Sequence, residues 1–92
     1  MINTDNVYKQ VPGYLLEEMD GEIVLLHPAK KSILYCNQSS ALIWSLIDGQ
    51  RSVGTIHTLL VEGYPESKAL ITNDLPEVLN TLVSYDAIVQ VS

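Results

Sequence analysis

Residues 31–49 read KSILYCNQSSALIWSLIDG, and this stretch decides the fold of the chain. The run 33–36 is apolar and rich in β-formers, and it stops at Asn37. Asn37 is a good helix N-cap because its side-chain oxygen can accept a hydrogen bond from an N–H group one turn into the helix. Apolar residues then recur at helical spacing until Asp48-Gly49, where Gly49 can take the left-handed conformation that ends many helices. A strand therefore leads straight into a capped helix, and the two must pack together.

Two further strands are predicted before this stretch, over residues 14–19 and 22–26. Asp20-Gly21 between them is a strong signal for a two-residue hairpin turn, because both central positions of such a turn need positive φ. The second strand is apolar without alternation, which is typical of a central strand covered on both faces. After a turn at residues 27–30 the chain returns as a third strand, Ser32–Cys36. The simplest topology is an antiparallel meander with the third strand at an edge.

Three helices are predicted after the strands, over residues 38–47, 53–62 and 67–85. Ser52 is the expected cap of the second helix, and Gly63 its end. Pro76 lies inside the third helix, where it removes an N–H group and crowds the preceding turn. We therefore expect a kink, or a restart of the helix with Asn73 or Asp74 as cap.

A short β-like run over residues 88–91 closes the chain. The order predicts an α+β fold like a winged helix-turn-helix: a three-stranded antiparallel β-sheet, then three α-helices and a short C-terminal strand. Residues 1–10 are polar and aperiodic, so we expect a flexible N-terminus followed by a single domain over residues 11–92.

Composition narrows the class of partner. The chain has 92 residues, a formal net charge of −6, five basic residues and one cysteine. Nucleic-acid affinity comes largely from lysine and arginine contacts to phosphates, so this balance argues against a nucleic-acid partner. No apolar run is long enough to cross a membrane, and the first residues do not resemble a signal peptide. With one cysteine no internal disulfide can form, which fits the cytoplasm.

The sequence contains no pattern of catalytic or metal-binding residues. The two histidines and the cysteine do not have metal-ligand spacing, and the glycines are dispersed rather than gathered in a phosphate-binding loop. Cys36 is better explained as a small buried apolar residue than as a nucleophile. We therefore predict a protein that is not an enzyme and that uses no cofactor and no metal.

The predicted third strand, Ser32–Cys36, is the feature that points to a function. Edge strands carry unpaired N–H and C=O groups, which proteins either protect or use. The C-terminal run 88–91 could cover this edge. Alternatively, an extended peptide could add to it as a further strand, with the third helix as the wall of an apolar groove beside it. Four or five such hydrogen bonds contribute only a few kcal/mol, at about 0.5–1.5 kcal/mol each, so the groove must supply the remaining affinity.

The chain resembles the PqqD-like family of RiPP recognition elements, which act on ribosomally synthesised and post-translationally modified peptides. The resemblance lies in LYCN at residues 34–37, ALIWSLIDG at residues 41–49, Ser52-Val53, the spacing of Asp74-Leu75, Val78-Leu79 and Leu82, and the closing Ala87-Ile88-Val89. It runs from about Gly21 to Val91. The chain departs from the usual family pattern at four places: Cys36, His27-Pro28, Tyr85-Asp86 and Pro76.

The resemblance implies a peptide chaperone without catalytic activity. Such domains bind the leader segment of a precursor peptide as an added strand and present it to a modifying enzyme, such as a radical SAM enzyme, a cyclase or a leader protease. The positions of this chain that correspond to the family's binding site are Ser32, Ile33, Leu34, Tyr35 and Cys36 in the strand, and Asp74, Leu75, Val78, Leu79 and Leu82 in the third helix.

Two other interpretations stay open. The edge strand could pair with its own copy across a two-fold axis, which would make the chain a small structural or dimerisation module and a homodimer. The helix order also permits a winged-helix DNA-binding regulator. A recognition helix needs basic or amide side chains at its front; the second helix offers none, and the third offers Lys68, Asn73 and Asn80.

Overall fold

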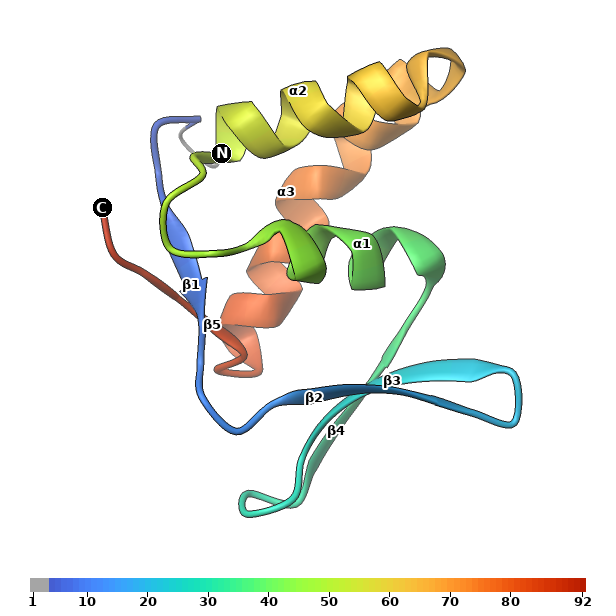
Figure 1. The fold of residues 1–92 in the computed structure, drawn as a ribbon, viewed down its shortest axis with the longest axis vertical. Coiled ribbons are helices and arrows are strands. Elements are labelled where there is room, and N and C mark those ends of the chain that lie inside the picture. Colours follow the sequence, from blue (N-terminus) through green and yellow to red (C-terminus); the bar gives the residue numbers. More distant parts are fainter. Residues whose placement is uncertain (1–3) are drawn as a thin grey trace.

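The computed structural model describes residues 4–92 and confirms the α+β architecture (Figure 1). Three helices lie over one face of a three-stranded sheet, and a second small sheet stands beside them near both termini. In chain order the elements are β1 (Tyr8–Gln10), β2 (Leu15–Met19), β3 (Glu22–His27), β4 (Ser32–Cys36), α1 (Gln38–Leu46), α2 (Val53–Gly63), the 3₁₀ turn η1 (Pro65–Ser67), α3 (Lys68–Ser84) and β5 (Ile88–Gln90).

The three-stranded sheet has the order β2-β3-β4, with antiparallel pairing throughout. Asp20 and Gly21 form the tight turn between β2 and β3, with φ angles of 52° and 81°. In β3, Val24 and Leu25 point to opposite faces and are 4% and 0% exposed. The predicted hairpin and the predicted central strand are therefore both confirmed.

The first helix begins as predicted and ends earlier. The Asn37 Oδ1 atom accepts a hydrogen bond of 2.8 Å from the Ser40 N–H group, which fixes the start of α1. The helix ends at Leu46, and Ile47 is already extended, with ψ 110°. Gly49 does have a positive φ of 82°, but it lies in the following turn and donates its N–H to the Tyr8 carbonyl oxygen at 2.9 Å. The prediction that Gly49 ends the helix is therefore wrong. The positive φ of Gly49 belongs to a turn that this hydrogen bond to β1 holds in place.

The second and third helices follow the sequence closely. Ser52 Oγ accepts a 3.2 Å hydrogen bond from the Thr55 N–H group and so caps α2, which ends at Gly63. Helix α3 continues through Pro76 over 17 residues, so the predicted restart at Asn73 or Asp74 is wrong. Leu75 directly precedes Pro76 and Leu79 follows it by three residues, and their side chains are 3% and 0% exposed. Their burial holds the helix in one piece although one backbone hydrogen bond is missing.

The two ends of the chain pair with each other. Tyr8–Gln10 forms β1, which pairs with β5 in an antiparallel register that puts Tyr8 opposite Gln90. The expectation of a flexible N-terminus over residues 1–10 is therefore wrong for β1, while residues 1–3 lie outside the described residues. The hypothesis that the C-terminal run covers β4 is also wrong, since this run forms β5, which pairs with β1 and not with β4. A three-residue strand has too few positions for a periodic signal, and only its pairing reveals it.

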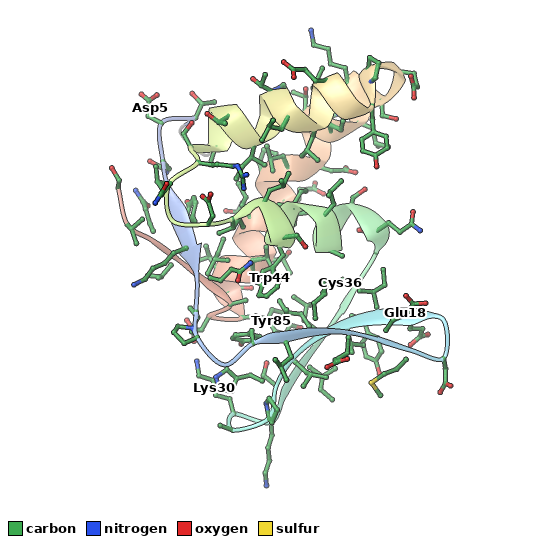
Figure 2. All side chains as sticks on the ribbon, viewed as in Figure 1. Asp5, Glu18, Lys30, Cys36, Trp44 and Tyr85 are labelled. Carbon is green, nitrogen blue, oxygen red and sulfur yellow. The ribbon has the colours of Figure 1, made fainter. Side chains whose placement is uncertain are left out.

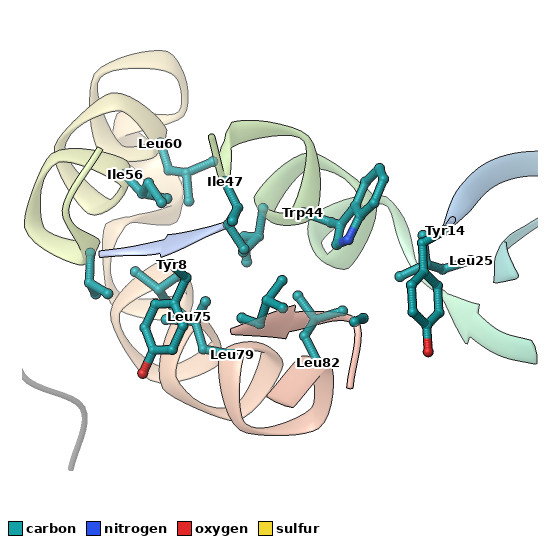
Figure 3. Close-up of a cluster of buried hydrophobic side chains, with 14 residues drawn as sticks. Tyr8, Tyr14, Leu25, Trp44, Ile47, Ile56, Leu60, Leu75, Leu79 and Leu82 are labelled. Carbon is teal, nitrogen blue, oxygen red and sulfur yellow. The ribbon is translucent and has the colours of Figure 1, made fainter. Parts of the chain in front are cut away.

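One hydrophobic core joins the helices to the inner face of the sheet (Figure 3). Its largest fully buried side chains are Leu25, Ile47, Ile56, Leu79 and Leu82. Burying a side chain of this size contributes about 1.5–3 kcal/mol. The core therefore fixes the position of α3 relative to the sheet, and this position creates the site described next.

Candidate functional site

Strand β4 has one edge to which no segment of residues 4–92 pairs. Its side chains alternate: Ile33 and Tyr35 are 57% and 69% exposed on the outer face, whereas Leu34 and Cys36 pack against the core. All five predicted residues of this strand, including Ser32, lie on the edge as expected. An open edge of this kind offers a row of backbone donors and acceptors to an extended chain.

A cavity of about 160 Å³ lies between this edge and α3. Leu34, Tyr35 and Cys36 form its strand side, and the first turn of α1 closes it at Ser40. On the helix side the lining residues are Glu77, Val78, Thr81 and Leu82. We call the β4 edge together with this cavity the β4–α3 groove.

The predicted residues of α3 divide into two groups. Val78 lines the β4–α3 groove and is partly exposed, whereas Leu75 and Leu79 lie in the core; Leu82 borders the groove but is only 1% exposed and belongs to the core as well. Asp74 lies one turn before Val78 and lines a second cavity. Glu77, Thr81 and Ser40 were not predicted, although Glu77 and Thr81 immediately precede Val78 and Leu82 in the sequence. The sequence showed only the apolar stripe of the helix. Such a stripe identifies the apolar face but does not show which neighbouring element packs against each residue of it.

The second cavity, of about 450 Å³, follows the groove along α3. The start of α1, the end of α2 and the start of α3 enclose it, and these three ends lie on the same side of the molecule (Figure 1). Its lining residues are Gln38, Ser39, Leu42, Ile43, Leu60, Tyr64, Ser67, Leu70, Ile71 and Asp74. Since Ser39 and Ser40 are neighbours on α1, the two cavities follow one another past its first turn.

Cys36 lies at the end of β4 beneath the sheet-to-helix connection (Figure 2). Burial raises the pKa of its thiol, so the group stays protonated at neutral pH. The Sγ atom lies 3.7 Å from the Leu34 carbonyl oxygen, to which the thiol can donate a weak hydrogen bond. A protonated thiol is a weak nucleophile, and the Cys36 side chain acts as part of the apolar floor of the groove.

Neither a metal site nor a membrane span is found in residues 4–92. No group of three or more histidine, cysteine, aspartate or glutamate residues could hold a metal ion there. No helix in the same range is both long and apolar enough to cross a bilayer.

The comparison with family models decides the identity of the domain. The model for coenzyme PQQ synthesis protein D (PqqD) matches residues 22–88, which is most of the chain and contains both walls of the β4–α3 groove. The chain belongs to the PqqD family. The match leaves out β1 and β2, which precede it, and it confirms the family resemblance found in the sequence.

A solved structure shares the fold of this PqqD-family domain. It is described as TbiB1 in complex with the TbiA(beta) leader peptide, and it is 21% identical in sequence with a TM-score of 0.67. The alignment covers 87% of this chain and 93% of that chain. A search of curated proteins gave no match. The structural likeness extends the shared architecture to nearly the whole PqqD-family domain.

Proposed function

We propose that this PqqD-family domain binds the leader segment of a ribosomally synthesised precursor peptide. The leader adds as a strand to β4, and its side chains enter the β4–α3 groove. The observation that carries the proposal is the open β4 edge lying directly beside an apolar cavity. The complex of TbiB1 with a leader peptide supports it, because that protein has the same fold.

The geometry accounts for a usable affinity. Four or five strand hydrogen bonds contribute about 0.5–1.5 kcal/mol each. One apolar side chain of the guest, buried against Val78 and Leu34, adds about 1.5–3 kcal/mol. Association and ordering of the guest consume much of this sum, which leaves an affinity suited to reversible escort rather than permanent assembly.

We propose a holding role for the domain during modification of the precursor peptide. Among residues 4–92, Cys36 is a protonated, half-buried thiol and no metal cluster is present. We infer that the domain holds the leader while a separate enzyme acts on the remainder of the precursor. A radical SAM enzyme, a cyclase or a leader protease would each fit this division of labour.

Calorimetric titration with the leader of a precursor encoded beside this gene tests the proposal. Strand addition predicts that methylation of single backbone nitrogens of the leader weakens binding at alternate positions only, because every second N–H group points to β4. In ¹⁵N-labelled protein, amide shifts should concentrate on β4 and on the face of α3 around Val78. Tight binding without this alternation would refute strand addition.

A homodimer is the second candidate, and the outer face of the sheet favours it. Leu15, Met19, Ile33 and Tyr35 leave large apolar side chains exposed on that face. Exposed apolar patches of this kind often mark interaction sites. Sedimentation equilibrium at low micromolar concentration separates the two candidates. A dimer that a leader peptide dissociates would show that the dimer contact and the peptide exclude each other.

A further inference from the structure

The 450 Å³ cavity beyond the β4–α3 groove is not explained by strand addition. Most of its wall is apolar, and Leu70, Tyr64 and Leu42 leave 59%, 52% and 36% of their surfaces exposed around it. The ends of three helices enclose it, and the core keeps these ends in place. Such a cavity can accept a long side chain without rearrangement of the fold.

Asp74 gives this cavity its charge. Its side chain is half-buried, and it makes no hydrogen bond or ion pair with any other residue in the range 4–92. It is also the single charged residue among those that line the cavity. A carboxylate that loses contact with water as a guest covers it must be paired, otherwise its desolvation opposes binding.

We propose that this cavity binds a lysine or arginine side chain of the guest peptide. This inference rests on the proposed function, since the basic residue belongs to the same leader that pairs with β4. The aliphatic stem of the side chain packs on Leu70 and Ile71, and its cation pairs with Asp74. Long basic side chains bury their stems along apolar surface in this way while the charged end finds a partner.

Three helix ends lie at this cavity: the end of α2 and the start of α3 carry opposite partial charges that offset each other, which leaves the partial positive charge at the start of α1. A helix end amounts to about half an elementary charge, whereas Asp74 carries a full one. One of the free N–H groups at that end is already satisfied by the Asn37 side chain. The field at the cavity is therefore dominated by Asp74, which favours a cation over an anion.

The helix geometry sets the position of the basic residue in the guest. Val78, on the wall of the β4–α3 groove, lies four residues after Asp74 and seven after Ile71, which corresponds to about 6–10 Å along α3 at 1.5 Å per residue. An extended guest advances about 3.3 Å per residue. The lysine or arginine should therefore lie two or three residues from the guest side chain that contacts Val78, on the side of the guest beyond the Cys36 end of β4.

A random 16-residue peptide library displayed on phage tests the inference. Selection on the wild-type domain should enrich peptides with an apolar residue and a basic residue at this spacing. Selection on Asp74→Asn should retain the apolar residue and lose the basic one. Glu62→Gln is the matched control, because it removes the same charge from an exposed position of α2 outside the cavity.

A double-mutant cycle on one enriched peptide completes the test. Replacing its basic residue by norleucine should weaken binding about three- to tenfold on the wild type and leave the affinity of Asp74→Asn unchanged. Asp74→Glu should restore most of the difference in affinity between the basic peptide and its norleucine variant. This result separates a charge contact from damage to the fold.

The possible outcomes are distinct. Peptides that pair with β4 but show no basic preference overturn this inference and leave the proposed function intact. A library that yields no binding peptide removes the proposed function and this inference together.

Discussion

The Tyr14 hydroxyl group donates a hydrogen bond of 2.6 Å to the carbonyl oxygen of Tyr85. Tyr14 lies just before β2 and is 7% exposed, and Tyr85 is the residue that ends α3 (Figures 2 and 3). The bond therefore ties the three-stranded sheet to α3, the two elements that form the β4–α3 groove. The rings of His27 and Tyr14 pack in a T-shaped arrangement, with centroids 4.9 Å apart, and this contact holds the phenol in place.

Tyr14→Phe should lower the free energy of unfolding by about 0.5–1.5 kcal/mol, because it deletes this one bond and leaves a carbonyl oxygen unpaired. Urea denaturation followed by circular dichroism measures the change. Tyr64→Phe is the control, since the Tyr64 side chain is 52% exposed and makes no hydrogen bond within residues 4–92. An equal loss in both variants would show that the tie between Tyr14 and Tyr85 adds nothing.

Gly13→Ala should destabilise the domain by more than about 1 kcal/mol. Gly13 has a φ of 98°, which side-chain-bearing residues rarely adopt, and an added methyl group would meet the His27 ring. Gly63→Ala provides the comparison, because nothing lies near an added methyl group at the end of α2. Thermal unfolding should show a lower midpoint for Gly13→Ala and an equal or higher one for Gly63→Ala.

Val78→Asp should reduce affinity for a leader peptide at least about tenfold, because it places a charge where the guest buries an apolar side chain. Val83→Asp makes the same substitution on α3 at an exposed position outside the groove. Calorimetric titration of both variants separates loss of the groove from a general effect of added negative charge. If the two variants bind the peptide equally, Val78 does not contact it.

Asp48 should make the free energy of unfolding depend on pH in acid. Its Oδ1 atom accepts hydrogen bonds from the N–H groups of Gln50 and Arg51, at 2.9 and 2.8 Å, and these bonds lower the pKa of the carboxyl group below its usual value of 3.8. A carboxyl group with a lowered pKa stabilises the folded state above its unfolded pKa, and this contribution is lost as the pH falls through the lower, folded value. Asp48→Asn keeps an acceptor oxygen at the turn but cannot titrate.

The stability of the wild type should therefore fall more steeply than that of Asp48→Asn as the pH is lowered below about 4. Urea denaturation at half-unit steps of pH measures the two curves. Parallel curves over this range would show that the Asp48 carboxyl group has the same pKa in both states.

Cys36 should report occupancy of the groove. The raised pKa of its thiol leaves less thiolate at a given pH than a free cysteine has, so alkylation by iodoacetamide at pH 8 should be slower than that of a free cysteine. A leader peptide bound over β4 should slow it further, because Cys36 lines the cavity. Mass spectrometry of timed samples measures both rates. An unchanged rate at saturating peptide would place the guest elsewhere.

The same thiol affects stability at high pH. Since its folded pKa lies above the unfolded value, stability should be complete below the unfolded pKa and should decline as the pH rises from there through the folded value. Cys36→Ala should remove this decline.

The sequence predicted the features that depend on neighbouring residues. Asp20-Gly21 turns the hairpin because few other pairs accept two positive φ angles, and Asn37 and Ser52 cap their helices through bonds to residues three positions away. The edge position of β4 also followed from the order of strands and turns. These features involve short loops and local bonds, so the information for them lies within a few residues.

The pairing of β1 with β5 could not be predicted in this way, because it joins Tyr8 to Gln90 across the length of the chain. The sequence also did not show which apolar residues of α3 face the groove and which lie in the core. Its apolar stripe contains Leu75, Leu79, Val78 and Leu82, and periodicity treats all four alike.

The sequence alone thus determined that this protein has a capped strand-to-helix unit and an edge strand beside it. The tertiary structure decided that β5 leaves this edge free and that Val78 rather than Leu75 faces it. It also decided that the Asp74 side chain lies in a cavity beyond the edge without a partner among residues 4–92. The physical reason is the range of the interactions. Caps and turns are set by bonds between near neighbours, whereas exposure of an edge or a carboxylate depends on which distant segment packs against it.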